Sequence, residues 1–204
     1  MKPRIRRILF DFDGVLAPYR HERRIAALAT FAGCGHEVVR EALFTSGLEA
    51  QYDGGAIETE VYLDRLGAAV GQAIDADAWI AARLAASVAE VAMLDRVAAL
   101  DASLELAVLT NNGALMAQAI PRILGPLGQR FEGRVLCSGT LRMRKPDRAV
   151  FAMALERLGW ELADTLFVDD SFANVQSARR VGLHAETVTG SRSLGRVLRR
   201  YTLG

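Results

Sequence analysis

Two aspartates, Asp11 and Asp13, end an apolar run near the N-terminus, and a glycine, Gly14, follows them. A buried carboxylate destabilises a fold unless it is paired or holds a metal ion. At the carboxyl end of a parallel strand, the same carboxylates face the crevice in which α/β sheets bind ligands. We therefore expect Asp11 and Asp13 to take part in chemistry rather than to support the fold.

Three further groups of polar residues follow apolar runs or precede a helical pattern. They are Thr110-Asn111-Asn112-Gly113, Lys145-Pro146-Asp147 and Asp169-Asp170-Ser171. The carboxyl ends of parallel strands share one edge of a sheet, so these groups should converge on one crevice. The side chains of Asp11, Asp169 and Asp170 then offer the hard oxygen ligands that suit Mg²⁺.

The combined set of groups suits phosphoryl transfer. A carboxylate nucleophile can form an aspartyl-phosphate, and a second carboxylate two residues away can handle protons. Thr110 and the backbone amides around Asn111 can donate hydrogen bonds to phosphate oxygens. Lys145 and Mg²⁺ would offset the negative charges of the nucleophile and the phosphoryl group, which otherwise repel each other.

The elements that must position these groups follow from the apolar runs. Strands are predicted at residues 5–10, 104–109, 165–168 and 184–188, with a weaker one at 134–137. Apolar positions recur at helical spacing over residues 147–158, and Pro146 suits the start of a helix. Strands that alternate with helices predict an α/β fold with a doubly wound parallel sheet, a Rossmann-like core.

Residues 18–92 differ, because they show helical periodicity and no convincing strand. One apolar face comprises Ile25, Leu28, Ala29 and Ala32, and another comprises Ile80, Leu84, Val88 and Val91. Glycines are expected to separate the helices at Gly33, Gly35, Gly47, Gly54, Gly55, Gly67 and Gly71. We predict a helical cap over residues 18–92, inserted into a core of residues 1–17 and 93–204, which can lie over the two carboxylates.

The composition of the 204 residues excludes several classes of protein. A net charge of +1 gives no global reason to bind nucleic acid. The apolar stretches are too short to span a bilayer, and Asp11 interrupts the one that a signal peptide would need. Cys34 and Cys137 lack metal-ligand spacing. We expect a reduced, cytoplasmic protein with no nucleic-acid or membrane partner.

The chemistry-bearing groups resemble the four motifs of the haloacid dehalogenase-like (HAD) hydrolases. The matching segments are Asp11-Phe12-Asp13-Gly14, Thr110-Asn111, Lys145-Pro146-Asp147 and Asp169-Asp170. A lone Asp-x-Asp is weak evidence, but four motifs in order and at the usual separations are specific. The helical insertion is similar to the cap that this family carries between its first and second motifs.

The resemblance implies a role for each matched residue of the first three motifs. Asp11 would be the nucleophile and a Mg²⁺ ligand. Asp13 would protonate the leaving group and then activate water, with its backbone carbonyl on the metal. Thr110 and Asn111 would hold the phosphoryl group, and Lys145 would steady Asp11 and the phosphate.

The remaining matched residues would complete the site. Asp170 would bind Mg²⁺ directly, and Asp169 directly or through water. Phe12 and Gly14 would contribute to substrate binding. Ser171 and Asn174 would support the last motif.

Asp13 also bears on the type of reaction, because the dehalogenases of this family lack a carboxylate at that position. The expected function is that of a Mg²⁺-dependent phosphatase acting on a small phosphorylated metabolite, since a lid closes best over something small. A phosphomutase, a dehalogenase and a catalytically silent binding protein on the same fold remain alternatives. The sequence specifies neither the substrate nor the oligomeric state.

Other polar residues are less informative. The loop Tyr52-Asp53-Gly54-Gly55 can reach onto the site and select the substrate, or it can be a connecting turn. Tyr19-Arg20-His21 can meet the substrate, or it can be a surface hinge. His36 and His184 are expected to be structural. The basic residues of the last helix are expected to form a solvated face: Arg192, Arg196, Arg199 and Arg200.

Overall fold

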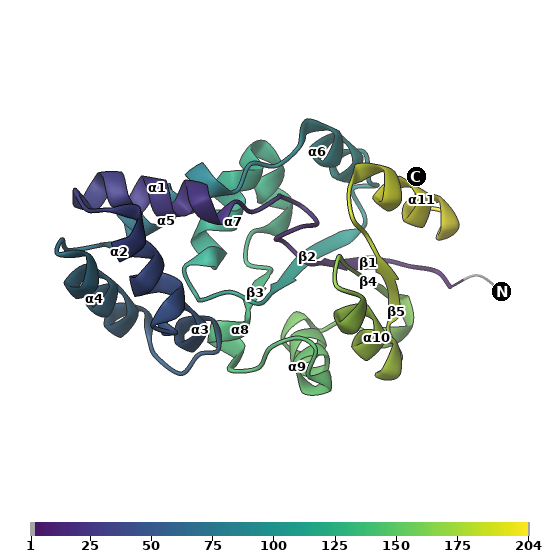
Figure 1. Ribbon diagram of the computed structural model, residues 1–204. Coiled ribbons are helices and arrows are strands. Elements are labelled where there is room, and N and C mark those ends of the chain that lie inside the picture. The colour runs from purple at the N-terminus through teal and green to yellow at the C-terminus, as the bar shows by residue number, and fades with distance from the viewer. Residues whose placement is uncertain (1–2, 204) are drawn as a thin grey trace.

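A computed structural model of the protein describes residues 3–203. Five parallel strands form one sheet in the order β3-β2-β1-β4-β5 (Figure 1). The strands are β1 (Arg7–Phe10), β2 (Glu105–Thr110), β3 (Val135–Cys137), β4 (Thr165–Asp169) and β5 (His184–Thr187). With helices on both faces of the sheet, the predicted doubly wound α/β core is confirmed.

The strand ends differ by one or two residues from the prediction, and two of these differences concern the site. Thr110 and Asp169 were expected to follow their strands, but they are the last residues of β2 and β4. The pairing continues to these residues because Thr110 lies opposite Cys137 in β3 and Asp169 lies opposite Thr187 in β5. Two polar site residues are therefore fixed by the sheet itself.

Successive residues of the central strand point to opposite faces and bury both of them. Ile8 and Phe10 pack into a core with α6 (Val91–Ala98), α7 (Met116–Leu124) and α11 (Ser191–Arg200). Leu9 packs into the second core with α9 (Arg148–Leu158) and α10 (Phe172–Arg180). Figure 1 shows α6 and α11 above the sheet and α9 and α10 below it.

The predicted helix after Lys145 is present as α9, but its start differs in detail. Asp147 is the N-cap residue, and its carboxylate accepts a hydrogen bond from the backbone N–H of Ala149 at 3.0 Å. Pro146 therefore precedes the cap residue rather than occupying the first helical turn. Three short elements complete the core: a 3₁₀ turn at Gly125–Phe131, α8 (Ser138–Leu141) and a 3₁₀ turn at Leu162–Asp164.

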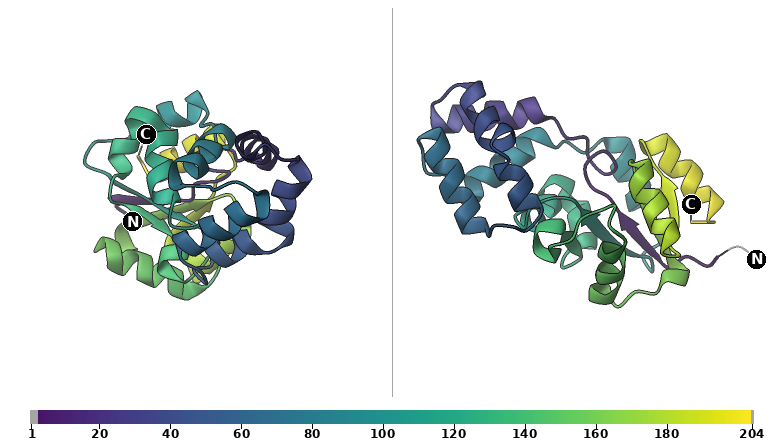
Figure 2. Two further views of the ribbon diagram at one scale, coloured as in Figure 1. Left: turned by 90° about the vertical axis from the view of Figure 1, so that its left-hand side faces the viewer. Right: turned by 60° about the horizontal axis from the view of Figure 1, so that its bottom comes forward.

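Between β1 and α6, the described residues form helices and no strand of the sheet. They are α1 (His21–Ala32), α2 (His36–Arg40), a π-helical turn (Glu41–Thr45), α3 (Leu48–Asp53), α4 (Thr59–Val70) and α5 (Ala76–Ala86). The right-hand view in Figure 2 shows them gathered at one end of the molecule, beside the sheet rather than within it. The limits of a cap at residues 18 and 92 remain a prediction.

Two expectations about the inserted helices are wrong in detail. Val88 and Val91 do not continue the buried face of Ile80, because α5 ends at Ala86 and the two valines are exposed. Gly67 does not separate helices but lies inside α4. A Cβ at Gly67 would come within 3.1 Å of the backbone oxygen of Gln72, so the glycine admits the chain that follows the helix.

The two connections between the inserted helices and the sheet run side by side. Tyr19 and Ser87 form an antiparallel bridge, and the backbone N–H of Arg20 donates to the carbonyl of Ala86 at 3.0 Å. Among the helices of residues 3–203, none is long and apolar enough to cross a membrane.

Candidate active site

Three adjacent strands bring the predicted site residues to one edge of the sheet. Asp11 follows β1 directly, Thr110 ends β2 and Asp169 ends β4. Since β1 lies between β2 and β4, these side chains meet where the carboxyl ends of the strands open towards the inserted helices. Lys145 reaches the same edge from the segment before α9.

Lys145 forms a buried ion-pair cluster with two of the aspartates. Its Nζ lies 2.9 Å from Oδ1 of Asp11 and 2.7 Å from Oδ2 of Asp169, and its side chain is 1% exposed. Burial opposes the charge of Lys145, but the carboxylates of Asp11 and Asp169 outweigh it and raise the pKa of the ammonium group. Lys145 is therefore a fixed positive charge beneath the site.

Asp11 is a buried carboxylate whose charge Lys145 balances only in part. Burial raises the pKa of Asp11 to about 7, Lys145 opposes this shift, and the charge of Asp169 adds to it. The backbone N–H of Phe12 donates to Oδ1 of Asp11 at 2.7 Å. A divalent cation beside Asp11 would favour its ionised, nucleophilic form.

The donor set for such a cation is present. One carboxylate oxygen from each of Asp11, Asp169 and Asp170 lies within 4.8 Å of the others. Burial and the neighbouring charge of Asp169 raise the pKa of Asp170, as expected for carboxylates crowded together. Three hard oxygen donors in this arrangement fit Mg²⁺.

Two residues that follow the last motif orient Asp169. Nδ2 of Asn174 lies 3.0 Å from both carboxylate oxygens of Asp169, and the backbone N–H of Ser171 donates to Oδ1 at 2.8 Å. Asn174 and Ser171 therefore have the geometry of the supporting role that the sequence indicates. Ser171 contributes its backbone here, and it is also the N-cap residue of α10.

Gly14 makes room for the metal-binding edge. Its φ is +84°, a left-handed conformation that side chains rarely adopt. A Cβ at this position would overlap the carboxylate of Asp170. The glycine therefore allows the first and last motifs to approach each other closely.

Asp13 lies apart from the acidic cluster and contacts the inserted helices. Its Oδ1 and Oδ2 each lie 3.0 Å from Nη2 of Arg83 in α5, and Nδ2 of Asn112 donates to Oδ2 at 2.9 Å. The side chain of Asp13 is 26% exposed. Two carboxylates only two residues apart thus have different surroundings, which allows them different roles.

Thr110, which ends β2, and Asn111, which follows it, make different contacts. Oγ1 of Thr110 accepts a hydrogen bond from Nδ2 of Asn112 at 2.7 Å, which leaves the hydroxyl hydrogen of Thr110 free to point elsewhere. The side chain of Asn111 exchanges two hydrogen bonds with the backbone of Lys145, at 2.8 and 2.9 Å. Asn111 thus ties the loop after β2 to the loop that presents Lys145.

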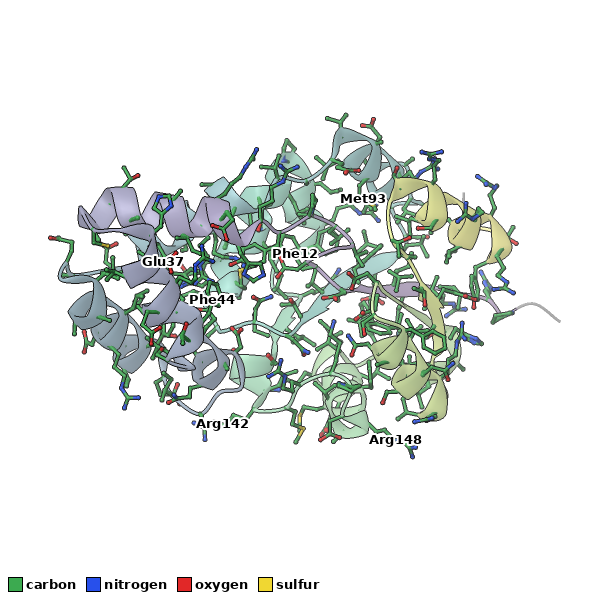
Figure 3. The ribbon with its side chains drawn as sticks, viewed as in Figure 1. Phe12, Glu37, Phe44, Met93, Arg142 and Arg148 are labelled. Carbon is green, nitrogen blue, oxygen red and sulfur yellow. The ribbon has the colours of Figure 1, made fainter. Side chains whose placement is uncertain are left out.

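Phe12 contributes its backbone rather than its ring to the site. The side chain is fully buried in the core that includes α7. Figure 3 labels Phe12 near the middle of the molecule, between the inserted helices and the sheet. The ring anchors the strand end from which Asp11 and Asp13 project.

Tyr52 and Asp53 were expected in a loop, but they are the last two residues of α3, and both contact the core. The backbone N–H of Gly113 donates to Oδ1 of Asp53 at 2.7 Å, and the backbone N–H of Leu115 donates to the hydroxyl of Tyr52 at 3.0 Å. Burial, with the nearby charge of Glu49, raises the pKa of Asp53 to about 7. These contacts fix the end of α3 against the loop that follows Thr110.

Sequence reasoning missed a buried polar network inside the inserted helices. Arg24 pairs with Glu49 through both of its terminal nitrogens, and Arg24 also donates to the hydroxyls of Tyr19 at 3.2 Å and Tyr62 at 3.0 Å. Arg24, Glu49 and Tyr62 come from α1, α3 and α4, and Tyr19 precedes α1. Nothing in their spacing signals the network, because it depends on how the helices pack.

The predicted structural histidines show no metal-binding partners in the described part of the chain. Nε2 of His184 lies 3.2 Å from the backbone oxygen of Ala163, and the one carboxylate cluster with metal-binding geometry in residues 3–203 contains no histidine. Cys34 and Cys137 are both free thiols.

Comparison with solved structures gives the fold. A predicted HAD-like family hydrolase from Porphyromonas gingivalis superimposes with a TM-score of 0.73 at 24% identity, covering 96% of this chain and 98% of that one. A HAD family enzyme from Bacteroides thetaiotaomicron, solved with magnesium and inorganic phosphate, gives 0.72 at 23% identity over 91% and 96%. L-2-haloacid dehalogenase from Xanthobacter autotrophicus gives 0.61 at 22% identity over 98% and 84%.

Curated relatives match shorter segments. Protein CbbY of Cupriavidus necator is 34% identical over 86 residues, which is 41% of this chain and 33% of that protein. Drimenol cyclase drtB of Aspergillus calidoustus is 40% identical over 52 residues, or 26% of this chain and 10% of that protein. The chain thus spans a third or less of the curated relatives it matches.

A family model for haloacid dehalogenase-like hydrolases matches residues 5–182, which include all four motifs. The chain belongs to this family.

Proposed function

We propose that this haloacid dehalogenase-like hydrolase is a Mg²⁺-dependent phosphatase that hydrolyses a small phosphorylated metabolite through an aspartyl-phosphate on Asp11. The observation that carries the proposal is the contrast between its two carboxylates. Asp11 lies in the cluster with Lys145 and the other aspartates, whereas Asp13 lies outside it and is 26% exposed. This contrast supports a nucleophilic role for Asp11 and an acid–base role for Asp13.

The first half of the reaction forms the covalent intermediate. The carboxylate of Asp11 attacks phosphorus, the bond to the ester oxygen breaks, and Asp13 gives its proton to that oxygen. Lys145, 2.9 Å from Asp11, offsets the negative charge that nucleophile and phosphoryl group share. The hydroxyl of Thr110 is available to donate to a phosphoryl oxygen.

The second half releases phosphate. Asp13, now ionised, takes a proton from a water molecule, and the water oxygen attacks the phosphorus of the aspartyl-phosphate. Inorganic phosphate leaves and the carboxylate of Asp11 is restored. Asp11, Asp169 and Asp170 would hold Mg²⁺, which supplies charge stabilisation and orients the phosphoryl oxygens.

The position of the inserted helices favours a small substrate. Asp53 and Tyr52 fix them against the loop after β2, and Arg83 contacts Asp13. A large folded substrate would have to displace these contacts. The presence of Asp13 favours a phosphatase over a dehalogenase, although an L-2-haloacid dehalogenase shares the fold.

The proposal is tested by hydrolysis of para-nitrophenyl phosphate with and without Mg²⁺, using the wild type and an Asp11→Asn variant. We expect turnover that requires both the metal and Asp11. Release of halide from a 2-haloacid, with no phosphate released from any ester, would instead indicate a dehalogenase. Dependence on a bisphosphate activator would indicate a phosphomutase.

A further inference from the structure

We propose that Arg83 makes this enzyme selective for phosphate monoesters whose leaving group carries a second anionic group, a carboxylate or another phosphate. The inference rests on the phosphatase function proposed above. It concerns a residue in α5, outside the four motifs.

Arg83 is a buried cation whose carboxylate partner belongs to the catalytic centre. Its side chain is 1% exposed, and its Nη2 contacts both oxygens of Asp13 at 3.0 Å. Within residues 3–203, its Nε has no hydrogen-bond partner. A buried guanidinium is destabilising unless its donors are satisfied, so an anionic group that enters beside Arg83 would gain an unused donor.

Arg24, the other deeply buried arginine of the inserted helices, differs from Arg83 in the residues that neutralise its charge. It pairs with Glu49 through both terminal nitrogens and donates to two tyrosine hydroxyls. Although the Nε of Arg24 also lacks a partner, its charge is neutralised within the inserted helices. The charge of Arg83 is instead neutralised across the boundary with the sheet, by a residue that must act on substrate.

The guanidinium of Arg83 is held in a fixed place. It stacks over the ring of Tyr19, with 4.0 Å from Cζ to the ring centroid. The backbone carbonyl of Arg83 accepts from the N–H of Ser87 at 2.9 Å, and Ser87 bridges to Tyr19 at the paired connections. Arg83 therefore lies at the base of the inserted helices, beside their two connections to the sheet.

The chemistry places the leaving group beside Arg83. Asp13 protonates the ester oxygen, so the part of the substrate beyond that oxygen must extend on the Asp13 side of the site. Nη2 of Arg83 lies within hydrogen-bond distance of Asp13 on that side. A carboxylate or phosphate a few bonds from the ester oxygen would meet a planar guanidinium, which binds such groups in a bidentate manner.

This contact gives a basis for selection. An anionic leaving group can accept hydrogen bonds from Arg83 in place of Asp13, and so leaves Asp13 free to act on the ester oxygen. A neutral leaving group offers no such exchange. A charge-assisted hydrogen bond of this kind corresponds to a preference of about 10- to 100-fold in kcat/KM.

The test compares matched esters: 3-phosphoglycerate with glycerol 3-phosphate for a carboxylate, and fructose 1,6-bisphosphate with fructose 6-phosphate for a second phosphate. The proteins are the wild type, Arg83→Met, Arg83→Lys and the control Arg65→Met, an exposed arginine of α4. We expect the wild type to prefer the member with the second anionic group in at least one pair by about 10-fold or more. Arg83→Met should lose the preference mainly through KM, Arg83→Lys should keep part of it, and Arg65→Met should keep all of it.

A binding measurement separates this inference from the phosphatase proposal. The affinity for 3-phosphoglycerate and for fructose 1,6-bisphosphate is measured by calorimetry in the Asp11→Asn background, with and without Arg83→Met. We expect Arg83→Met to weaken binding of the preferred ester about 10-fold or more and to leave unchanged the affinity for the matched ester that lacks the second anionic group. Equal kcat/KM values for both members of each pair, with turnover that needs Asp11 and Mg²⁺, would overturn this inference and support the phosphatase proposal. Selective binding that depends on Arg83, without phosphate release by the wild type, would support the role of Arg83 in binding and overturn the phosphatase proposal.

Discussion

Nζ of Lys145 lies 2.7 Å from Oδ2 of Asp169, and the two side chains are 1% and 0% exposed. The same Nζ contacts Asp11, so one ammonium group balances two buried carboxylates. Removing one member of a buried ion pair leaves an uncompensated charge, which is more destabilising than the loss of a surface pair.

We expect Lys145→Met to lower the free energy of unfolding by about 3–5 kcal/mol, because Asp11 and Asp169 lose their common counter-ion. Mg²⁺ should restore part of the loss, since a cation at the acidic cluster replaces the missing charge. Denaturant unfolding with and without Mg²⁺ measures both effects. The control is Arg144→Met, at the exposed neighbouring residue, and equal stabilities of the two variants would contradict the buried-charge argument.

Asp13→Asn should retain the fold and lose about 10²- to 10⁴-fold in kcat, the usual contribution of a general acid–base group. The amide keeps the shape of the side chain but can neither donate a proton to the ester oxygen nor accept one from water. Steady-state phosphate release measures the loss, and circular dichroism checks the fold. Asp64→Asn, an exposed aspartate of α4, serves as the control, and turnover of Asp13→Asn at the wild-type rate would exclude the acid–base role.

Gly14→Ala should weaken Mg²⁺ binding as well as stability. The positive φ makes any side chain strained, and the Cβ would also overlap the carboxylate of Asp170. Gly71→Ala is a matched control, because Gly71 has a φ of +78° but open space around the position of a Cβ. Both variants should lose about 1 kcal/mol to backbone strain.

Only Gly14→Ala should show reduced Mg²⁺ affinity, measured by calorimetry. If the two variants bind Mg²⁺ equally well, the approach of Asp170 to Gly14 does not shape the metal site.

Asp53→Asn should reduce the pH dependence of stability. The pKa of Asp53 is about 7 in the folded protein against an ordinary value of 3.8, so the folded state holds its proton more tightly than the unfolded state. The free energy of unfolding should therefore fall as pH rises from about 4 to 7. Above pH 7 the whole contribution of the protonated Asp53 to stability is lost. The asparagine carries no charge at any pH and keeps an oxygen that can accept from Gly113.

Thermal unfolding at pH 5 and pH 8 measures this effect. We expect the wild type to lose at least about 1 kcal/mol more than Asp53→Asn between these pH values, or about 2–4 °C in Tm. The similar shift of Asp11 is common to both proteins and cancels in the comparison. An identical fall in Tm for both would show that Asp53 is not the source.

The sequence predicted the core and its chemistry because the relevant signals are local. Asp11, Thr110 and Asp169 each stand at the end of an apolar run, and the sheet order then brings the ends together. Even there, the limits of the strands were missed at Thr110 and Asp169, since pairing with the next strand extends β2 and β4 through polar residues.

The inserted helices were less predictable. Helical spacing identified them, but the continuation of one face from Ile80 to Val91 was wrong because the chain leaves α5 after Ala86. The contacts of Arg83 with Asp13 and of Asp53 with Gly113 join residues 70 and 60 positions apart in sequence. No local pattern marks such pairs, because they depend on the packing of the helices against the sheet.

The bridge between Tyr19 and Ser87 has a consequence for how this molecule can change over evolutionary time. The two ends of the insertion are adjacent, so inserted segments of different lengths can join the core at the same two points. The entropic cost of bringing these ends together rises only slowly with the length of the insertion. Such a bundle can be lengthened, trimmed or exchanged as a cassette without disturbing the order of the strands. Arg83 lies one helical turn before the end of the insertion and belongs to it. Replacing the inserted helices would therefore replace the residue that contacts Asp13 and leave Asp11 in place.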